Sequence, residues 1–267
     1  MMKFMKYLFE AFFVYLIFII IRVVGLNLGR KISAFIFLNI GTLFRSKKII
    51  KENISTAFDG INNSDSDKII KQMWNNYGFI FAEYLFMKKF RLNKFSKPHI
   101  SIKGIKIIED VIKSGKPAIF ISGHFANFEL MAMELEKQNF QISALYRKLN
   151  NFFLNPIMEF FRTSYICKDQ IAKPLPGEDK GGTRELLSRV KDRRNIALMV
   201  DQKLTEGIIA KLFNKDCYTT RIPAQFAKKY NYKLVPISLK RVDKYFFEMN
   251  ILDEIDFSKE DSELQIT

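Results

Sequence analysis

The residues best suited to chemistry in this sequence are His124 and Glu129, five positions apart within residues 122–129, Ser-Gly-His-Phe-Ala-Asn-Phe-Glu. Residues 117–121 before them are apolar and typical of a buried strand. Residues 130–135 after them show the pattern of an amphipathic helix. A histidine can remove a proton from a hydroxyl group near neutral pH, and a neighbouring carboxylate raises its basicity and fixes its tautomer. We therefore interpret His124 as a candidate general base and Glu129 as the acid that orients it.

The spacing of this pair limits the local structure. Five positions of a continuous helix correspond to about 500° of rotation, so the two side chains would not share a helical face. They can meet only if His124 precedes the first helical turn and Glu129 lies inside it. Gly123 permits such a turn, and Asn127 suits the N-cap. The alternative is that His124 is an ordinary loop or core histidine. The second histidine, His99, follows a Lys-Pro pair and is expected at the surface.

Composition bounds the class of protein. A chain of 267 residues with 48% hydrophobic residues can form one large α/β domain with an appendage, or two small domains. Two cysteines without metal-ligand spacing argue against a disulfide framework and favour a reducing compartment. The net charge of +15 favours anionic partners such as acidic lipid, phosphorylated substrates or nucleic acid. An AT-rich coding bias would produce the same abundance of lysine, isoleucine, asparagine and phenylalanine without any ligand.

Several common motifs are absent from the sequence. It contains no GxSxG elbow, no Walker A loop, no GxGxxG fingerprint and no zinc-type cluster. Residues 181–184, Gly-Gly-Thr-Arg, are expected to begin a helix. We therefore expect no metal and no cofactor.

Residues 11–28 form an apolar run in which Arg22 is the only charged residue. Eighteen helical residues span about 27 Å, close to the hydrocarbon thickness of a bilayer. Three interpretations remain open: a transmembrane anchor, an interfacial helix with Arg22 reaching the headgroups, and a buried helix of a soluble core. We expect membrane attachment, with residues 1–45 as a membrane-anchoring helical segment and residues 46–267 as an α/β domain.

Beyond this run the pattern predicts alternating helices and strands. A helix is expected over residues 69–87. From residue 100, short apolar runs centred on Ile119, Ala144, Ala197 and Val235 alternate with helical patterns at 128–137, 156–165, 183–193 and 223–230, and a last strand falls within 246–255. This rhythm predicts an α/β fold with a mostly parallel central sheet flanked by helices.

Polar residues follow three of the predicted strands. His124 follows the first, Tyr146 and Arg147 end the second, and Asp201 and Gln202 follow the third. Ligand sites of parallel sheets lie at the carboxyl ends of the strands. We therefore expect these side chains to converge.

The ordered set of motifs resembles the bacterial lipid A biosynthesis acyltransferases, the late acyltransferases of the lysophospholipid acyltransferase superfamily. Residues 124–129 resemble the HxxxxE form of their first motif, Tyr146-Arg147 followed by Asn150 resembles their second, and residues 198–202 resemble their Asp-Gln strand end. Further similarity extends over nearly the whole chain, at Asn53, Glu83, Lys211–Phe213, Thr219, Thr220, residues 234–237 and Arg241.

The resemblance implies transfer of a fatty acyl chain from acyl carrier protein to a hydroxyl group of a lipid A precursor. It places the protein at the inner membrane, with the catalytic domain on the cytoplasmic side. It implies that His124 acts as the general base paired with Glu129 and that Arg147 binds a phosphate or the developing oxyanion. Tyr146, Asn150, Asp201 and Gln202 would contribute to substrate binding. No nucleic acid is expected as a partner.

Two alternatives remain. One is acylation of a lysophospholipid or another lipid, although Gly123 before the histidine favours the lipid A branch. The other is a non-catalytic basic protein that binds membrane or nucleic acid. The chain also departs from the family pattern. Asn214 replaces a usual glycine, and the expected carboxyl-terminal segment with Trp and His is missing, which indicates a fragment or a trimmed acyl site.

Overall fold

The chain forms two compact units. The computed structural model describes residues 2–173, 181–202, 204–243, 246–258 and 260–266. One unit comprises Met1–Lys88 with Lys211–Lys215, and the other comprises Lys89–Ala210 with Asp216–Thr267. Each unit is described by itself below.

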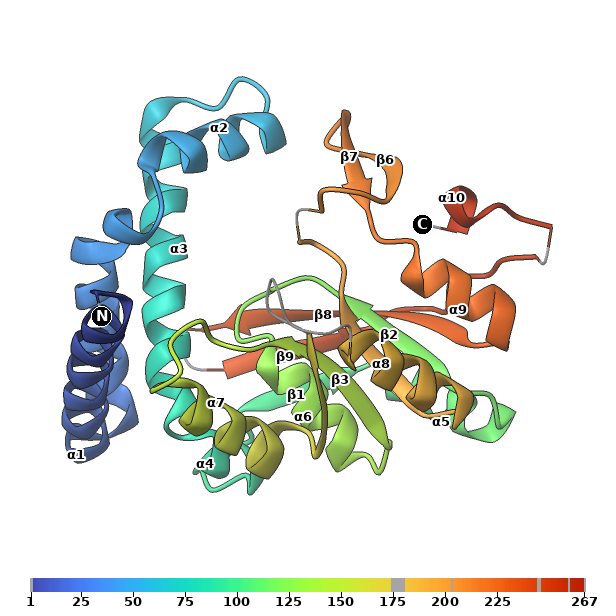
Figure 1. The fold of residues 1–267 in the computed structure, drawn as a ribbon, viewed down its shortest axis with the longest axis horizontal. Coiled ribbons are helices and arrows are strands. Elements are labelled where there is room, and N and C mark those ends of the chain that lie inside the picture. Colours follow the sequence, from blue (N-terminus) through green and yellow to red (C-terminus); the bar gives the residue numbers. More distant parts are fainter. Residues whose placement is uncertain (1, 174–180, 203, 244–245, 259, 267) are drawn as a thin grey trace. The chain divides into compact units, whose positions relative to one another are not determined.

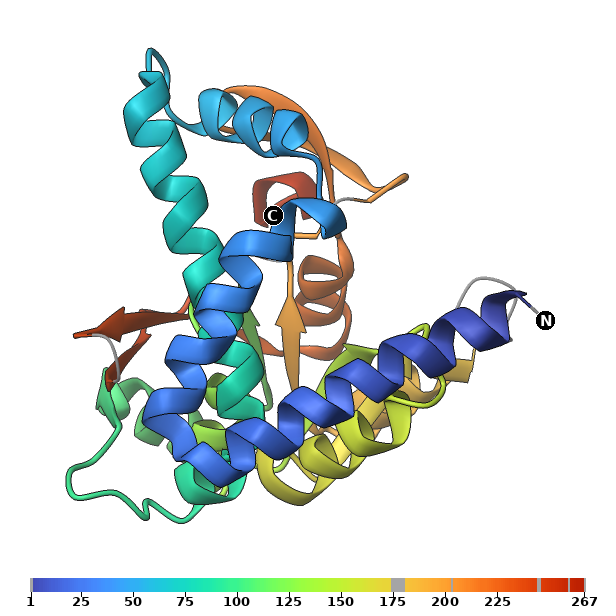
Figure 2. The same ribbon diagram turned by 90° about the vertical axis from the view of Figure 1, so that its left-hand side faces the viewer.

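The first unit is built from the three helices α1 (Met2–Phe44), α2 (Lys47–Ala57) and α3 (Asn63–Tyr84). Helix α3 begins where the sequence offers a cap, since the Asn62 side chain accepts a hydrogen bond from the backbone N–H of Asp65 at 2.9 Å. Helix α1 bends at Gly25, whose φ of 82° and ψ of 172° are not helical. Figure 2 shows the two resulting arms of α1, which meet at an angle. The apolar run is therefore two helical arms and not one straight helix.

The second arm of α1, which follows Gly25, packs antiparallel to α3. A Cβ atom on Gly78 would lie 2.5 Å from the Cα atom of Ala34, so the close approach of the helices requires glycine there. Four residues before Ala34, the buried Arg30 guanidinium donates to the buried Glu83 carboxylate at 2.8 Å. The pairing satisfies both charges inside the helix pair.

The first arm of α1 exposes many of its apolar side chains, including Phe9, Phe12 and Phe13. Arg22, the one charged residue of the apolar run 11–28, is held by the protein, because it donates to the Leu85 carbonyl oxygen at the end of α3, at 3.0 Å. By length and composition, Met2–Leu43 is the one helix in the described residues that could cross a membrane.

The second unit is organised around a sheet with the strand order β1-β9-β8-β2-β5-β3-β4 (Figure 1). All its pairings are parallel except that of β8 with β9. The strands are β1 (Ile100–Lys103), β2 (Ala118–Ser122), β3 (Ile142–Arg147), β4 (Asp169–Lys173), β5 (Asn195–Met199), β8 (Lys233–Val242) and β9 (Phe246–Ile251). A separate two-stranded ribbon joins β6 (Ile208–Leu212) to β7 (Lys215–Thr219). The remaining helices of the chain are α4 (Met87–Arg91), α5 (Ile105–Ser114), α6 (Glu129–Lys137), α7 (Asn155–Phe161) with the π-helical turn η1 (Arg162–Ile166), α8 (Gly181–Lys191), α9 (Ile222–Tyr230) and α10 (Glu263–Ile266).

Helices cover both faces of this sheet. Ile119 of β2 packs in one apolar cluster with Leu186 of α8 and Phe226 of α9. The next residue, Phe120, points to the opposite face because side chains alternate along a strand. There it contacts Phe140, just after α6, with ring centroids 5.5 Å apart. The predicted fold class, a mostly parallel sheet flanked by helices and preceded by a long apolar helix, is confirmed.

The topology brings four chain segments to one edge of the sheet. Strands β2, β5, β3 and β4 are adjacent and parallel, so their carboxyl ends lie side by side. Residues that end or follow these strands, among them His124, Asp201, Arg147 and Lys173, therefore start from the same edge.

Candidate active site

The imidazole of His124 is held by Asp201. Oδ1 of Asp201 lies 2.7 Å from Nδ1 of His124, and Oδ2 accepts the backbone N–H of His124 at 2.8 Å. An ionised carboxylate only accepts hydrogen bonds, so Nδ1 carries the hydrogen and Nε2 of a neutral ring keeps its lone pair. The ring also contacts Phe128 edge-on, with centroids 4.6 Å apart. These contacts fix both the position and the tautomer of the histidine.

The loop before α6 allows Asp201 to approach this closely. A Cβ atom on Gly123 would lie 3.2 Å from Oδ2 of Asp201 and 3.1 Å from the Phe125 ring. Ala126 has a φ of 44°, in the left-handed region that non-glycine residues rarely occupy. A glycine and a left-handed residue on either side of His124 thus turn the chain so that the imidazole faces Asp201.

The hydrogen bonds correct the expected pairing of His124 with Glu129. Glu129 begins α6 and accepts two hydrogen bonds from Arg162, from Nη2 at 2.5 Å and from Nε at 3.1 Å. The N-cap position is held by Phe128, without a side-chain cap bond, and not by Asn127. Because helix α6 starts at Glu129 itself, its carboxylate meets the π-helical turn η1 and not the ring of His124.

His124, Glu129 and Arg162 nevertheless line the same cavity, of about 240 Å³. Apolar side chains form much of the rest of its wall, among them Phe120, Met131, Leu135, Ile166, Leu198 and Ile237. The hydroxyl of Tyr146 donates to Glu159 at 2.7 Å, and the Arg162 guanidinium lies over the Tyr146 ring at 4.9 Å. Burial, reinforced by Glu159, raises the pKa of Tyr146, so this residue stays a neutral hydrogen-bond donor. The cavity wall therefore combines charged side chains with a larger apolar surface.

The structure gathers most of the other predicted site residues here. Arg147, Tyr146 and Gln202 line the cavity with His124, and Asp201 reaches it through the imidazole. Asn150 is exposed and is not among the lining residues. Lys173, at the end of β4, lines the cavity as well.

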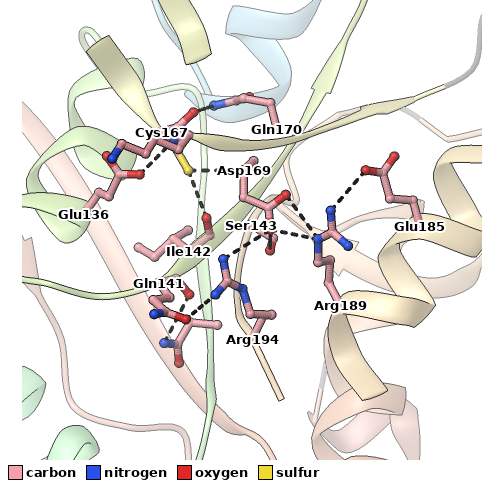
Figure 3. A network of polar contacts seen from close by, with 12 residues as sticks. Glu136, Gln141, Ile142, Ser143, Cys167, Asp169, Gln170, Glu185, Arg189 and Arg194 are labelled. Carbon is pink, nitrogen blue, oxygen red and sulfur yellow. Dashed lines mark hydrogen bonds and ion pairs between the residues drawn. The ribbon is translucent and has the colours of Figure 1, made fainter. Parts of the chain in front are cut away.

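A polar network at the opposite end of β3 and β4 fixes the register of these two strands (Figure 3). Asp169, the first residue of β4, accepts from Ser143 at 2.5 Å and from Nε of Arg189 in α8 at 2.8 Å. Ser143 and Asp169 are paired in register, and four residues further along so are Arg147 and Lys173. The network thereby determines which side chains of β3 and β4 lie side by side at the cavity.

Sequence reasoning missed the part played by Arg162. The predicted helix over 156–165 contains it, but nothing in that pattern indicates the π-helical turn that carries it. Such turns are frequent at functional sites, yet they leave no clear sequence pattern. Among the described residues, no group of three or more His, Cys, Asp and Glu side chains is placed to hold a metal ion.

A carboxylate-held histidine at the carboxyl edge of a parallel sheet, beside a largely apolar cavity, defines a candidate proton-transfer site of an α/β enzyme. The family model for bacterial lipid A biosynthesis acyltransferases matches residues 2–267, so the chain belongs to this family and is an acyltransferase of the lipid A type. Among curated proteins the comparison found no match to this sequence.

Proposed function

We propose that the protein transfers a fatty acyl chain from acyl carrier protein to a hydroxyl group of a lipid A precursor, with His124 as the general base. The observation that carries the proposal is the hydrogen bond of Asp201 to Nδ1 of His124, beside a cavity with largely apolar walls. It leaves Nε2 available for the proton of the attacking hydroxyl group. General-base assistance of this kind accelerates a reaction by about 10²–10⁴-fold.

In the proposed reaction the acceptor oxygen attacks the carbonyl carbon of the thioester while Nε2 of His124 takes the hydroxyl proton. The C–S bond breaks as the tetrahedral intermediate collapses, and the imidazolium returns the proton to the leaving thiolate. Asp201 stabilises the imidazolium throughout. Because the thioester is already an activated acyl donor, no covalent acyl-enzyme is required.

The remaining predicted residues take supporting roles in this proposal. Glu129 holds Arg162 in the cavity wall through two hydrogen bonds. Arg147 binds a phosphate of the acceptor or the developing oxyanion, because its guanidinium fork matches two oxygens at once. Tyr146 and Gln202 shape the wall, and Asn150 contacts parts of the substrate that extend beyond the cavity.

We further propose that α1 attaches the protein to the inner membrane with the catalytic unit on the cytoplasmic side. The exposed apolar side chains of its first arm support attachment to a bilayer. The contact of Arg22 with the end of α3 supports it too, because a charge held by a carbonyl oxygen costs less in an apolar medium.

The test compares purified wild type with His124→Ala in detergent micelles. Labelled acyl carrier protein is the donor, and a lipid A precursor and a lysophospholipid are offered as separate acceptors. We expect turnover of the lipid A precursor and a loss of at least 10²-fold in kcat for His124→Ala. If only the lysophospholipid were turned over, the acceptor would be a lysophospholipid and not a lipid A precursor. If His124→Ala kept the turnover of wild type, His124 could not be the general base.

A matched control is His99→Gln. His99 lies outside the cavity-lining residues and packs among the rings of Phe90, Phe95 and Phe246. Its replacement is expected to lower thermal stability while leaving kcat within about twofold of wild type.

A further inference from the structure

The ribbon of β6 and β7, orange in Figure 1, turns at a residue that is poorly suited to the turn. Strand β6 ends at Leu212 and β7 begins at Lys215, so Phe213 and Asn214 alone connect them. Both have a positive φ, of 50° and 59°, as a type I′ turn requires. Asparagine and glycine enter this left-handed region readily, whereas a bulky side chain does so at a cost in backbone strain. Formation of the turn therefore does not explain a phenylalanine at this position.

The tip of the ribbon, defined as residues 211–215, also exposes apolar side chains. Leu212 is 56% exposed and Phe213 is 58% exposed. Ile209 of β6 and Tyr218 of β7 are exposed on the strands that lead to the tip. Single exposed apolar residues are ordinary, but a group of four on one small ribbon is typical of a surface that contacts a partner. The strained backbone and the exposed ring thus point to the same conclusion, that the tip has a role outside the folded chain.

The charges of the ribbon indicate what kind of partner this is. Lys211 and Lys215 border the apolar tip, and both are exposed. A lysine in such a place can keep its ammonium group in water while its alkyl stem lies along apolar surface. Asp216 follows, so the two strands and their turn hold two lysines and one aspartate and attract an acidic protein only weakly. Burial of the apolar side chains must supply most of the attraction.

Three observations favour a lipid bilayer as the partner. The family acts in lipid A biosynthesis, so its acceptor is a lipid. The tip belongs to the same compact unit as α1, whose first arm exposes many apolar side chains. An apolar tip bordered by lysines, with Tyr218 further back, also follows the usual order of side chains at a membrane surface, where lysine and tyrosine lie at the headgroups and apolar side chains lie deeper.

We propose that Leu212 and Phe213 insert into the interfacial region of the bilayer and form a membrane contact in addition to α1. At about 3.3 Å per residue of a strand, Tyr218 lies roughly 10–13 Å behind the turn, which places it near the headgroups when the tip is about 5–10 Å deep. Each inserted side chain strengthens binding roughly tenfold, which adds to attachment by α1 and does not replace it. The inference goes beyond the proposed function, because the tip lies outside the residues that line the cavity.

Tryptophan fluorescence tests whether the tip enters the bilayer. Phe213→Trp is compared with Ile112→Trp, because Ile112 of α5 is equally exposed, at 58%. Each variant adds a second tryptophan to Trp74, and wild type supplies the emission to subtract. The proteins are reconstituted in phosphatidylcholine vesicles with ordinary or brominated acyl chains. Bromination should quench the added emission of Phe213→Trp about twofold, since the tip reaches the acyl boundary, and should leave that of Ile112→Trp unchanged.

Two outcomes of this measurement would overturn the proposal. One is equal quenching of the two variants by brominated lipid. The other is emission of Phe213→Trp that neither brominated lipid nor acrylamide in the water can quench, because protein would then cover the tip, as in an association of two copies of the chain. Neither the measurement nor its control uses an acceptor, so the result does not depend on turnover and is independent of the proposed function.

A partition measurement tests the same contact without an added tryptophan. It uses a chain in which Phe9, Phe12 and Phe13 are replaced by serine, so that the first arm of α1 does not mask the tip. In this chain Phe213→Asn should weaken binding to anionic vesicles about tenfold. Its Tm in detergent micelles should be no lower, because asparagine suits the turn. Ile112→Asn, the matched control, should leave vesicle binding within about twofold. Unchanged binding of Phe213→Asn, with a lowered Tm, would show that Phe213 acts inside the folded protein and would overturn the proposal.

Discussion

At the scale of single residues, the site depends on which carboxylate holds His124. Asp201 accepts from both the ring and the backbone N–H of His124. Glu129, which stands closer in the sequence, is occupied by Arg162. The two acids therefore have different proposed roles, since Asp201 fixes the tautomer of the base and Glu129 organises the cavity wall.

This division predicts the behaviour of Asp201→Asn. The amide group can offer a hydrogen to Nδ1, which would favour the tautomer with the hydrogen on Nε2 and remove the lone pair needed for the base. We expect kcat for the lipid A precursor to fall by about 10²-fold, with the KM values changed less than threefold. Initial rates with labelled acyl carrier protein measure this.

Asp110→Asn serves as its control, because Asp110 is an exposed residue of α5. It should retain the wild-type rate. If Asp201→Asn kept more than half of the wild-type kcat, the assignment of Asp201 as the orienting group would have to be abandoned.

The sequence predicted which residues gather at the candidate site, but not which of them are hydrogen-bonded to one another. The strand-end positions of His124, Arg147 and Asp201 follow from local patterns, because apolar runs followed by polar residues mark the carboxyl edge of a parallel sheet. The bond between His124 and Asp201 joins residues 77 positions apart. Such a pairing is decided by strand order, which places β5 beside β2, and no local pattern contains that order.

At the scale of secondary-structure elements, β4 was missed in the sequence and yet carries Lys173. Its sequence, Asp-Gln-Ile-Ala-Lys, is short and has one large apolar residue, so it lacks the pattern of a buried strand. Pairing with β3 and the contacts of Asp169 define it instead. The bend of α1 at Gly25 was missed because the apolar pattern runs through it without a break and therefore gives no sign that the helix changes direction.

The Asp169 network makes the stability of β4 depend on pH. Burial alone would raise the pKa of Asp169, but hydrogen bonds from Arg189 and Ser143 outweigh this effect and hold the pKa below its usual value of 3.8. The unfolded chain then binds the proton more readily than the folded chain. This contribution to stability is therefore present above about pH 4 and is lost as the pH falls further.

Asp169→Asn should remove this contribution. We expect the variant to be less stable than wild type at pH 7, and the difference to shrink between pH 5 and pH 3. Hydrogen exchange of residues 142–173, followed by mass spectrometry, reports on β3 and β4 directly, with Asp110→Asn as the control. A stability difference that stays constant over this pH range would show that the Asp169 carboxylate does not contribute through its charge.

At the scale of the whole molecule, two properties favour binding to a membrane by different physical routes. The net charge of +15 attracts anionic lipid, and this attraction weakens as salt screens it. The first arm of α1 offers apolar side chains, whose burial in hydrocarbon does not weaken with salt. Salt therefore separates a protein held by its charge from one held by its helix.

Vesicle flotation distinguishes the two routes. We expect the full chain to float with both neutral and anionic vesicles and to remain bound in 1 M salt. Two variants weaken the arm: deletion of residues 2–17, which keeps the contacts of Ile21 and Arg22 that fold the bend, and triple replacement of Phe9, Phe12 and Phe13 by serine. Both should float with anionic vesicles alone and be released by salt, while duplex DNA should not displace the full chain. If 1 M salt released the full chain as readily as the variants, electrostatic attraction would be sufficient to explain attachment, and the first arm of α1 could not be the membrane anchor.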